Sequence, residues 1–78
     1  MSRVDLENGH KLSIVGGPGL YGDGVDTFEV AVIKPNGDLM DLPNGDSVQG
    51  HVTMEQIQFF IDSVRRGNSI ETRLKLLT

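Results

Sequence analysis

The stretch VAVIKPNGDLMDL, from Val30 to Leu42, decides the fold, because one turn in it fixes how two strands pair. A two-residue loop at Asn36-Gly37 would place apolar residues opposite charged ones. A three-residue loop, Pro35-Asn36-Gly37, matches apolar with apolar and charge with countercharge, in the pairs Lys34–Asp38, Ile33–Leu39, Val32–Met40 and Val30–Leu42. Proline in the first loop position and a left-handed glycine in the third suit a turn with a G1 bulge. The sequence therefore predicts an antiparallel hairpin here.

Two further Asn-Gly pairs predict hairpins of the same kind. A loop over Glu7-Asn8-Gly9 gives the pairs Val4–Leu12 and Asp5–Lys11. A loop over Pro43-Asn44-Gly45 would pair Met40 with Val48. The strand after that third loop is weak, because Gly50 and His51 interrupt its alternating pattern.

Residues 54–66 predict an amphipathic helix. Thr53 followed by Gln56 forms a capping box at its start, and Gly67 supplies a left-handed stop at its end. The apolar residues repeat with the spacing of one helical face, at Ile57, Phe60, Ile61 and Val64.

The last ten residues, 69–78, fit two structures. Alternation favours a strand that buries Ile70, Thr72, Leu74 and Leu76. A helix capped by Ser69 would instead bury Ile70, Leu74 and Leu77. The preceding Gly-Asn break and the run of four alternating positions favour the strand, and the helix stays open as the alternative.

Together these elements predict an α+β fold and a single domain over residues 1–78. A mainly antiparallel sheet of four or five strands, made of a β-hairpin, a β-meander and a C-terminal strand, packs against one α-helix. The helix covers an apolar sheet face formed by Leu12, Ile14, Phe28, Val30, Val32, Met40 and Leu42.

The composition is that of a small globular chain. Its 78 residues are 37% hydrophobic and include no cysteine, so neither a disulfide nor a thiolate metal site is available. No apolar run approaches the roughly 18 residues of a membrane span, and no apolar leader follows Met1. We expect a complete, soluble, cytoplasmic protein without membrane contact.

Charge is unevenly distributed along the chain. The net charge is -4, with ten acids and three bases in residues 1–62 and four bases and one acid in residues 63–78. The acidic body makes nucleic acid an unlikely partner, because nonspecific binding depends on neutralising phosphates. The basic tail is a weak candidate for anion binding, or a set of solvated side chains beyond a helix, through Arg65, Arg66, Arg73 and Lys75.

The loop GGPGLYGDGVD, Gly16 to Asp26, contains a G-x-G-x-x-G pattern. A dinucleotide site needs a helix after this pattern, whereas a strand follows here, and Pro18 removes one backbone donor. A plain surface loop is the simplest interpretation. As a functional element we favour a loop that presents Leu20 and Tyr21 to a protein partner.

The sequence carries no catalytic or metal-binding pattern. The spacing of its aspartates does not match a calcium-binding loop. Its two histidines, His10 and His51, lack partners at the spacing of a catalytic triad or a zinc site. We expect no enzymatic activity, no metal and no cofactor.

Phe59 is expected on the outer face of the helix. Each helical residue turns ~100°, which places Phe59 roughly 140–160° from the core stripe. Glu55, Asp62 and Arg66 share this outer face. In a chain with 5% aromatics, an exposed phenylalanine is a candidate anchor for a partner or a second copy, unless the tail or the glycine-rich loop covers it.

The favoured hypothesis is a non-catalytic protein-interaction module that acts by surface binding. Such a module would be a small regulator, adaptor or inhibitor of a larger protein, and a homodimer is compatible with its small core. One alternative is a nucleic-acid-binding or DNA-mimic protein that uses the basic tail or the acidic body. A second is a small ligand-binding subunit that uses loop 16–26. The layout of hairpins and one helix resembles that of many small bacterial and phage-encoded proteins.

Overall fold

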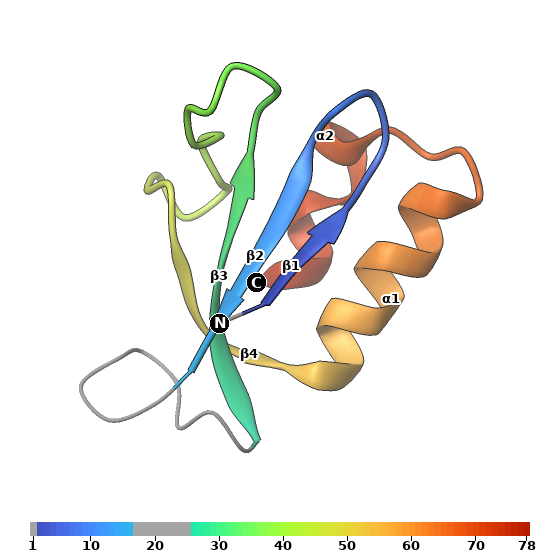
Figure 1. The fold of residues 1–78 in the computed structure, drawn as a ribbon. Helices are drawn as coiled ribbons and strands as arrows, with labels where there is room; N and C mark the ends of the chain where they lie inside the picture. Colours follow the sequence, from blue (N-terminus) through green and yellow to red (C-terminus); the bar gives the residue numbers. More distant parts are fainter. Residues whose placement is uncertain (1, 17–25) are drawn as a thin grey trace.

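The structure is a computed structural model that describes residues 2–16 and 26–78. Within them, four strands form one antiparallel sheet in chain order: β1 (Ser2–Asp5), β2 (Lys11–Val15), β3 (Thr27–Ile33) and β4 (Gln49–Thr53). Three helical segments form a second layer on one face of the sheet (Figure 1): α1 (Met54–Arg65), α2 (Ile70–Arg73) and the 3-10 helix η1 (Leu74–Leu77). The predicted α+β fold class is confirmed.

The first hairpin has the predicted register, with Val4 opposite Leu12. Its turn is of another kind than predicted. The His10 N–H donates to the Glu7 carbonyl at 2.9 Å, and Asn8 and Gly9 have φ values of 52° and 81°, as in a type I′ turn. This turn matches the twist of the two strands, and asparagine tolerates the left-handed conformation that it requires. The Leu6 N–H also bonds the His10 carbonyl, so Glu7 is an extra, bulged residue.

The turn over Pro35-Asn36-Gly37 is confirmed as predicted. The Lys34 N–H donates to the Asp38 carbonyl at 2.7 Å, and Gly37 is left-handed with a φ of 93°. The next turn repeats this geometry, because the Leu42 N–H donates to the Asp46 carbonyl at 2.7 Å. Both turns are therefore G1-bulge turns.

Beyond Met40, the predicted pairing is wrong. Val30 pairs with Gln49 of β4 and not with Leu42, and residues 41–48 lie outside the strands. The segment closes on itself, since the Asn44 side-chain amide donates to the Val48 carbonyl at 2.9 Å. Leu42 lies outside the strands but stays buried, because its side chain packs in the core cluster.

The weak outgoing strand exists as β4 and contains a β-bulge. Phe28 pairs with Val52 and Val30 with Gln49, so that Gly50 and His51 together stand opposite Glu29. His51 has a φ of 56°, a left-handed conformation that non-glycine residues adopt at a cost. The bulge accommodates Gly50 and His51, the two residues that interrupt the alternating pattern, and it makes this edge of the sheet irregular.

Helix α1 is confirmed with both of its predicted ends. Thr53 and Gln56 form the capping box. At the other end, the N–H groups of Gly67 and Asn68 donate back to the carbonyls of Val64 and Ser63, and Gly67 has a φ of 100°. This is a Schellman motif, which stops the helix and turns the chain back toward the sheet.

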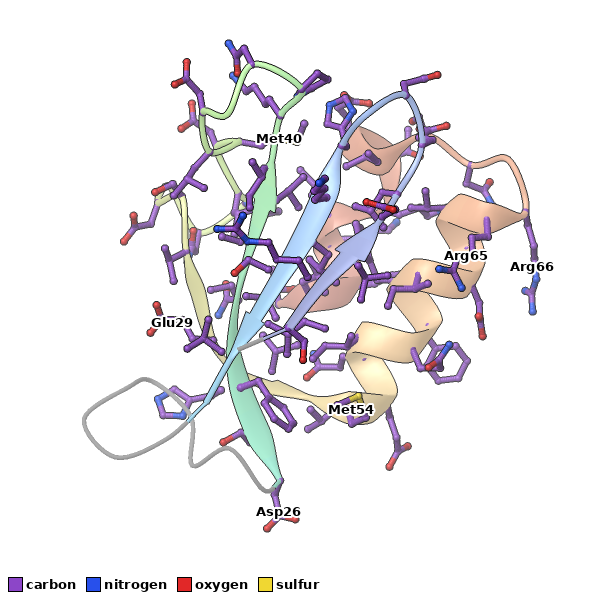
Figure 2. All side chains as sticks on the ribbon, viewed as in Figure 1. Asp26, Glu29, Met40, Met54, Arg65 and Arg66 are labelled. Carbon is purple, nitrogen blue, oxygen red and sulfur yellow. The ribbon has the colours of Figure 1, made fainter. Side chains whose placement is uncertain are left out.

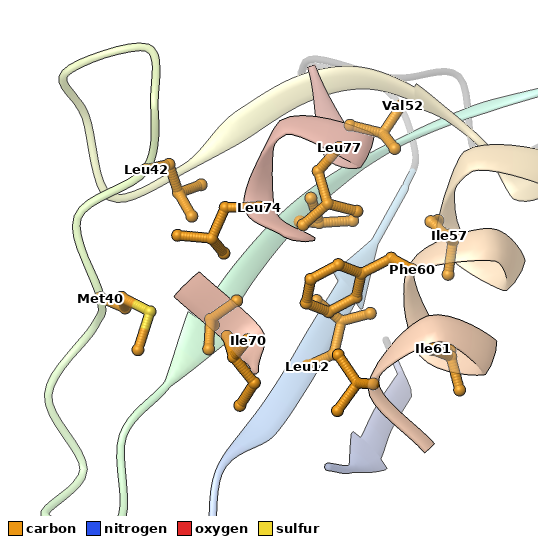
Figure 3. Close-up of a cluster of buried hydrophobic side chains, with 13 residues drawn as sticks. Leu12, Met40, Leu42, Val52, Ile57, Phe60, Ile61, Ile70, Leu74 and Leu77 are labelled. Atoms are coloured by element: carbon orange, nitrogen blue, oxygen red, sulfur yellow. The ribbon is translucent and has the colours of Figure 1, made fainter. Parts of the chain in front are cut away.

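The predicted C-terminal strand is wrong, and residues 70–77 are helical. Ser69 caps α2, and the buried residues of this segment follow the helical alternative at Ile70, Leu74 and Leu77. One helix cannot cover a four-stranded sheet, and α2 and η1 fill the face that α1 leaves open. Figure 3 shows Leu74 and Leu77 between Phe60 of α1 and Leu42 of the 41–48 segment.

Candidate interaction surface on helix α1

Phe59 lies on the side of α1 that faces away from the sheet. Its side chain is 68% exposed, whereas the adjacent Phe60 is fully buried. Among the described residues, the other exposed large hydrophobics are Met54 and Leu39, at 48% and 41%. The C-terminal segment does not cover Phe59, because that segment packs on the inner side of α1. Phe59 is thus the largest apolar contact that the described surface offers.

Charged and polar side chains surround Phe59 on the same side of the helix. We define the outer α1 surface as Glu55, Gln58, Phe59, Asp62, Arg65 and Arg66. Glu55 lies in the first turn and Arg65 in the last, the order that the helix macrodipole favours. Figure 2 shows Met54 at the start of α1 and the two arginines at its end. The surface is therefore acidic toward one end and basic toward the other.

One carboxylate of this surface is held in place from within the helix. The Gln58 side-chain amide donates to the Asp62 carboxylate at 3.0 Å, a contact between residues one turn apart. Asp62 is accordingly half-buried, whereas Glu55 and Arg66 are exposed. The ends of the surface present free charge, and its centre presents the aromatic ring.

The start of α1 is fixed by Gln56, a residue that the sequence indicates only as a cap. Its Oε1 accepts from the Thr53 N–H at 2.9 Å, and its Nε2 donates to the Thr78 carbonyl at 2.8 Å. One carboxamide thus caps the helix and ties it to the end of the chain. The second contact has no signal in the sequence, because 22 residues separate the partners.

The four basic residues suggested for anion binding differ in their surroundings. Arg65, Arg66 and Lys75 are exposed. Arg73 is half-buried, and its guanidinium donates to the Asn68 side-chain carbonyl at 2.8 Å. Asn68 in turn donates to the Ser63 carbonyl, so Arg73 holds the link between α1 and α2.

The remaining candidate residues are not assembled into a site in the part of the chain that the structure describes. Leu20 and Tyr21 lie outside the described residues. Within 2–16 and 26–78, no group of three His, Cys, Asp or Glu side chains is placed to hold a metal ion. Asp38 and Asp46 belong to the two G1-bulge turns. Their backbone N–H groups donate to the side-chain oxygens of Asn36 and Asn44, both at 2.9 Å.

No family model, curated protein or solved structure matches this chain. None of the described helices has the length and apolar character that crossing a membrane requires. The chemistry of any partner of the outer α1 surface must therefore be inferred from the residues of that surface.

Proposed function

We propose that the protein is a non-catalytic interaction module whose outer α1 surface binds another protein. The exposed ring of Phe59 is the observation that carries this proposal. Burying the exposed part of such a ring contributes roughly 1–2 kcal/mol, and aromatic anchors surrounded by polar groups dominate many interfaces.

The charges around Phe59 define the chemistry of the partner. A matching surface has an apolar pocket for the ring, basic groups opposite Glu55 and acidic groups opposite the two arginines. A module of this size acts as a regulator, adaptor or inhibitor by occluding or bridging a larger protein. The acidic residues of the rest of the chain would steer its approach to a basic region.

The test compares two exposed apolar positions. The wild type, Phe59→Ser and Leu39→Ser are used as baits in the native cell, and captured proteins are quantified by mass spectrometry. We expect Phe59→Ser to lose the captured partner by about tenfold or more, as for an interface hot spot. Leu39→Ser should retain the partner, because Leu39 pairs with Ile33 in the hairpin after β3, which Figure 1 shows away from α1.

A partner that both variants retain at the wild-type level would contradict the assignment of this surface. Tyr21→Ala tests the glycine-rich loop separately. Loss of the partner with Tyr21→Ala alone would move the binding surface from α1 to that loop.

A further inference from the structure

We propose that the outer α1 surface pairs with itself, so that two copies of this chain associate through antiparallel α1 helices about a two-fold axis. This inference rests on the proposed function, because it uses the same surface and names its occupant as a second copy. A tighter-binding partner would take the place of that copy.

The charge pattern of α1 makes this helix better suited than most other surfaces of the chain to contact a second copy. Residues 54–66 carry two acids and two bases and are neutral, although the whole chain has a net charge of -4. Two copies that meet through this helix therefore avoid most of the repulsion between two acidic proteins. Antiparallel pairing also sets the acidic start of each helix against the basic end of the other.

The spacing of the outer residues fits this arrangement. Glu55, Phe59, Asp62 and Arg66 follow one another at intervals of four, three and four residues, the seam spacing of paired helices. A two-fold axis between positions 60 and 61 places each Glu55 opposite Arg66 of the second copy. The seam is roughly 16 Å long, since each helical residue rises 1.5 Å.

The same axis brings the two aromatic rings together. Phe59 stands at the level of Asp62 in the other copy, so the two rings are ~4.5 Å apart along the helix axis. Rings at this offset stack across the axis. Asp62 beside them keeps its hydrogen bond from Gln58, which leaves one of its oxygens paired when water is displaced.

Other ways of pairing bring like charges together. Parallel α1 helices would set Glu55 against Glu55 and Arg66 against Arg66, which is unfavourable. Pairing through Leu39 would bring Asp38 and Asp41 of both copies together. The antiparallel α1 pair sets charge against countercharge at both ends of the seam and brings the two Phe59 rings together at its centre.

The test is a charge exchange followed by sedimentation equilibrium from about 10 µM to about 1 mM, because a small interface predicts weak association. We expect Phe59→Ala to weaken self-association at least ~tenfold. E55R and R66E alone should each weaken it by about tenfold, since every such change makes two symmetric contacts repulsive. The double variant E55R/R66E should return to within about twofold of the wild type.

A mixture of the two single variants gives the sharpest readout. E55R and R66E repel their own copies, but each complements the other at both ends of the seam. We expect the equimolar mixture to form heterodimers at concentrations where each variant alone is monomeric.

The controls separate this surface from net charge and from folding. E71R and K75E change the net charge as E55R and R66E do, but they lie on α2 and η1, and self-association should change by less than about twofold. Circular dichroism checks that each variant is folded. If a charge reversal unfolds the chain, Glu55→Gln and Arg66→Gln replace it and should each weaken the dimer by about threefold.

Three results would overturn the dimer: a wild type that stays monomeric at about 1 mM, a dimer indifferent to Phe59→Ala, or a charge exchange that restores nothing. If the wild type is monomeric but Phe59→Ser still abolishes binding of a foreign partner, the dimer is wrong and the proposed function stands. A confirmed dimer with no foreign partner at Phe59 would leave the dimer and remove the role at a larger protein.

Discussion

The carboxylate of Glu7 accepts a hydrogen bond from the backbone N–H of Ile70, with 3.3 Å between Oε1 and N. The two residues are 63 positions apart. Glu7 is the bulged residue of the first hairpin, and Figure 1 shows the β1–β2 turn next to the start of α2. The N–H of the first residue of a helix has no partner within the helix, so an acceptor from elsewhere stabilises it.

Replacing Glu7 should therefore loosen the C-terminal helices. We expect Glu7→Ala to lower the free energy of unfolding by about 1–2 kcal/mol, since it leaves a half-buried N–H without its acceptor. Urea denaturation measures the change. Glu71→Ala, which removes an exposed acid from the same helix, is the matched control and should change stability by less than about 0.5 kcal/mol. Equal effects of the two changes would show that the Glu7 contact contributes nothing specific.

Gln56 allows its two contacts to be separated by one substitution. Gln56→Glu keeps the oxygen that accepts from Thr53 but loses the donor to the Thr78 carbonyl. We expect the start of α1 to stay protected in hydrogen exchange, while amides of residues 76–78 exchange at least ~tenfold faster. Gln56→Ala should accelerate exchange at both places. If Gln56→Glu leaves residues 76–78 at the wild-type rate, the tie to Thr78 is dispensable.

The left-handed backbone of His51 predicts an order among its substitutions. His51→Asn and His51→Val both remove the imidazole, but only asparagine readily adopts positive φ. We expect the valine variant to be less stable than the asparagine variant by about 1–2 kcal/mol in thermal denaturation. A strand without the bulge would prefer valine, so the opposite order would contradict the β4 geometry.

The tail offers a test of helix against strand. Leu77 is buried and Leu76 half-buried, whereas the strand pattern would bury Leu76 and expose Leu77. We expect Leu77→Ala to destabilise the protein by about 2–4 kcal/mol and Leu76→Ala by about 1 kcal/mol or less. Because a small domain has little stability to lose, the measurement is best made with a stabilising osmolyte present. A larger destabilisation by Leu76→Ala than by Leu77→Ala would support a C-terminal strand in place of the helices.

The sequence predicts what short-range chemistry controls. The turn at Pro35 follows from side-chain matching across a few residues, and both ends of α1 follow from Thr53, Gln56 and Gly67. The pairing of Val30 cannot be predicted in this way, because Leu42 can be buried either in a strand opposite Val30 or in the core from a segment outside the strands. The tail fits both periodicities, and only the sheet face left open by α1 selects the helix.

The outer α1 surface was predictable to a similar degree. Helical geometry alone places Phe59 opposite the core, and its exposure confirms that placement. The role of Arg73 could not be read from the sequence, because its bond to Asn68 depends on how the chain turns after Gly67. Leu20 and Tyr21 remain a prediction.

The 41–48 segment connects two residues that pair with the same edge of β3: Met40, which bonds to Val32, and Gln49, which pairs with Val30. Its two ends are thus held by the sheet, independently of what lies between them. Leu42 must stay in the core, but Asn44 and Gly45 at the tip are exposed, and no atom of the described residues beyond its chain neighbours lies within 4 Å of where a Cβ on Gly45 would stand. A chain that closes on itself in this way tolerates added length at small entropic cost. The tip is therefore a natural graft point for a reporter peptide, because Figure 1 shows this segment at the edge of the sheet away from α1.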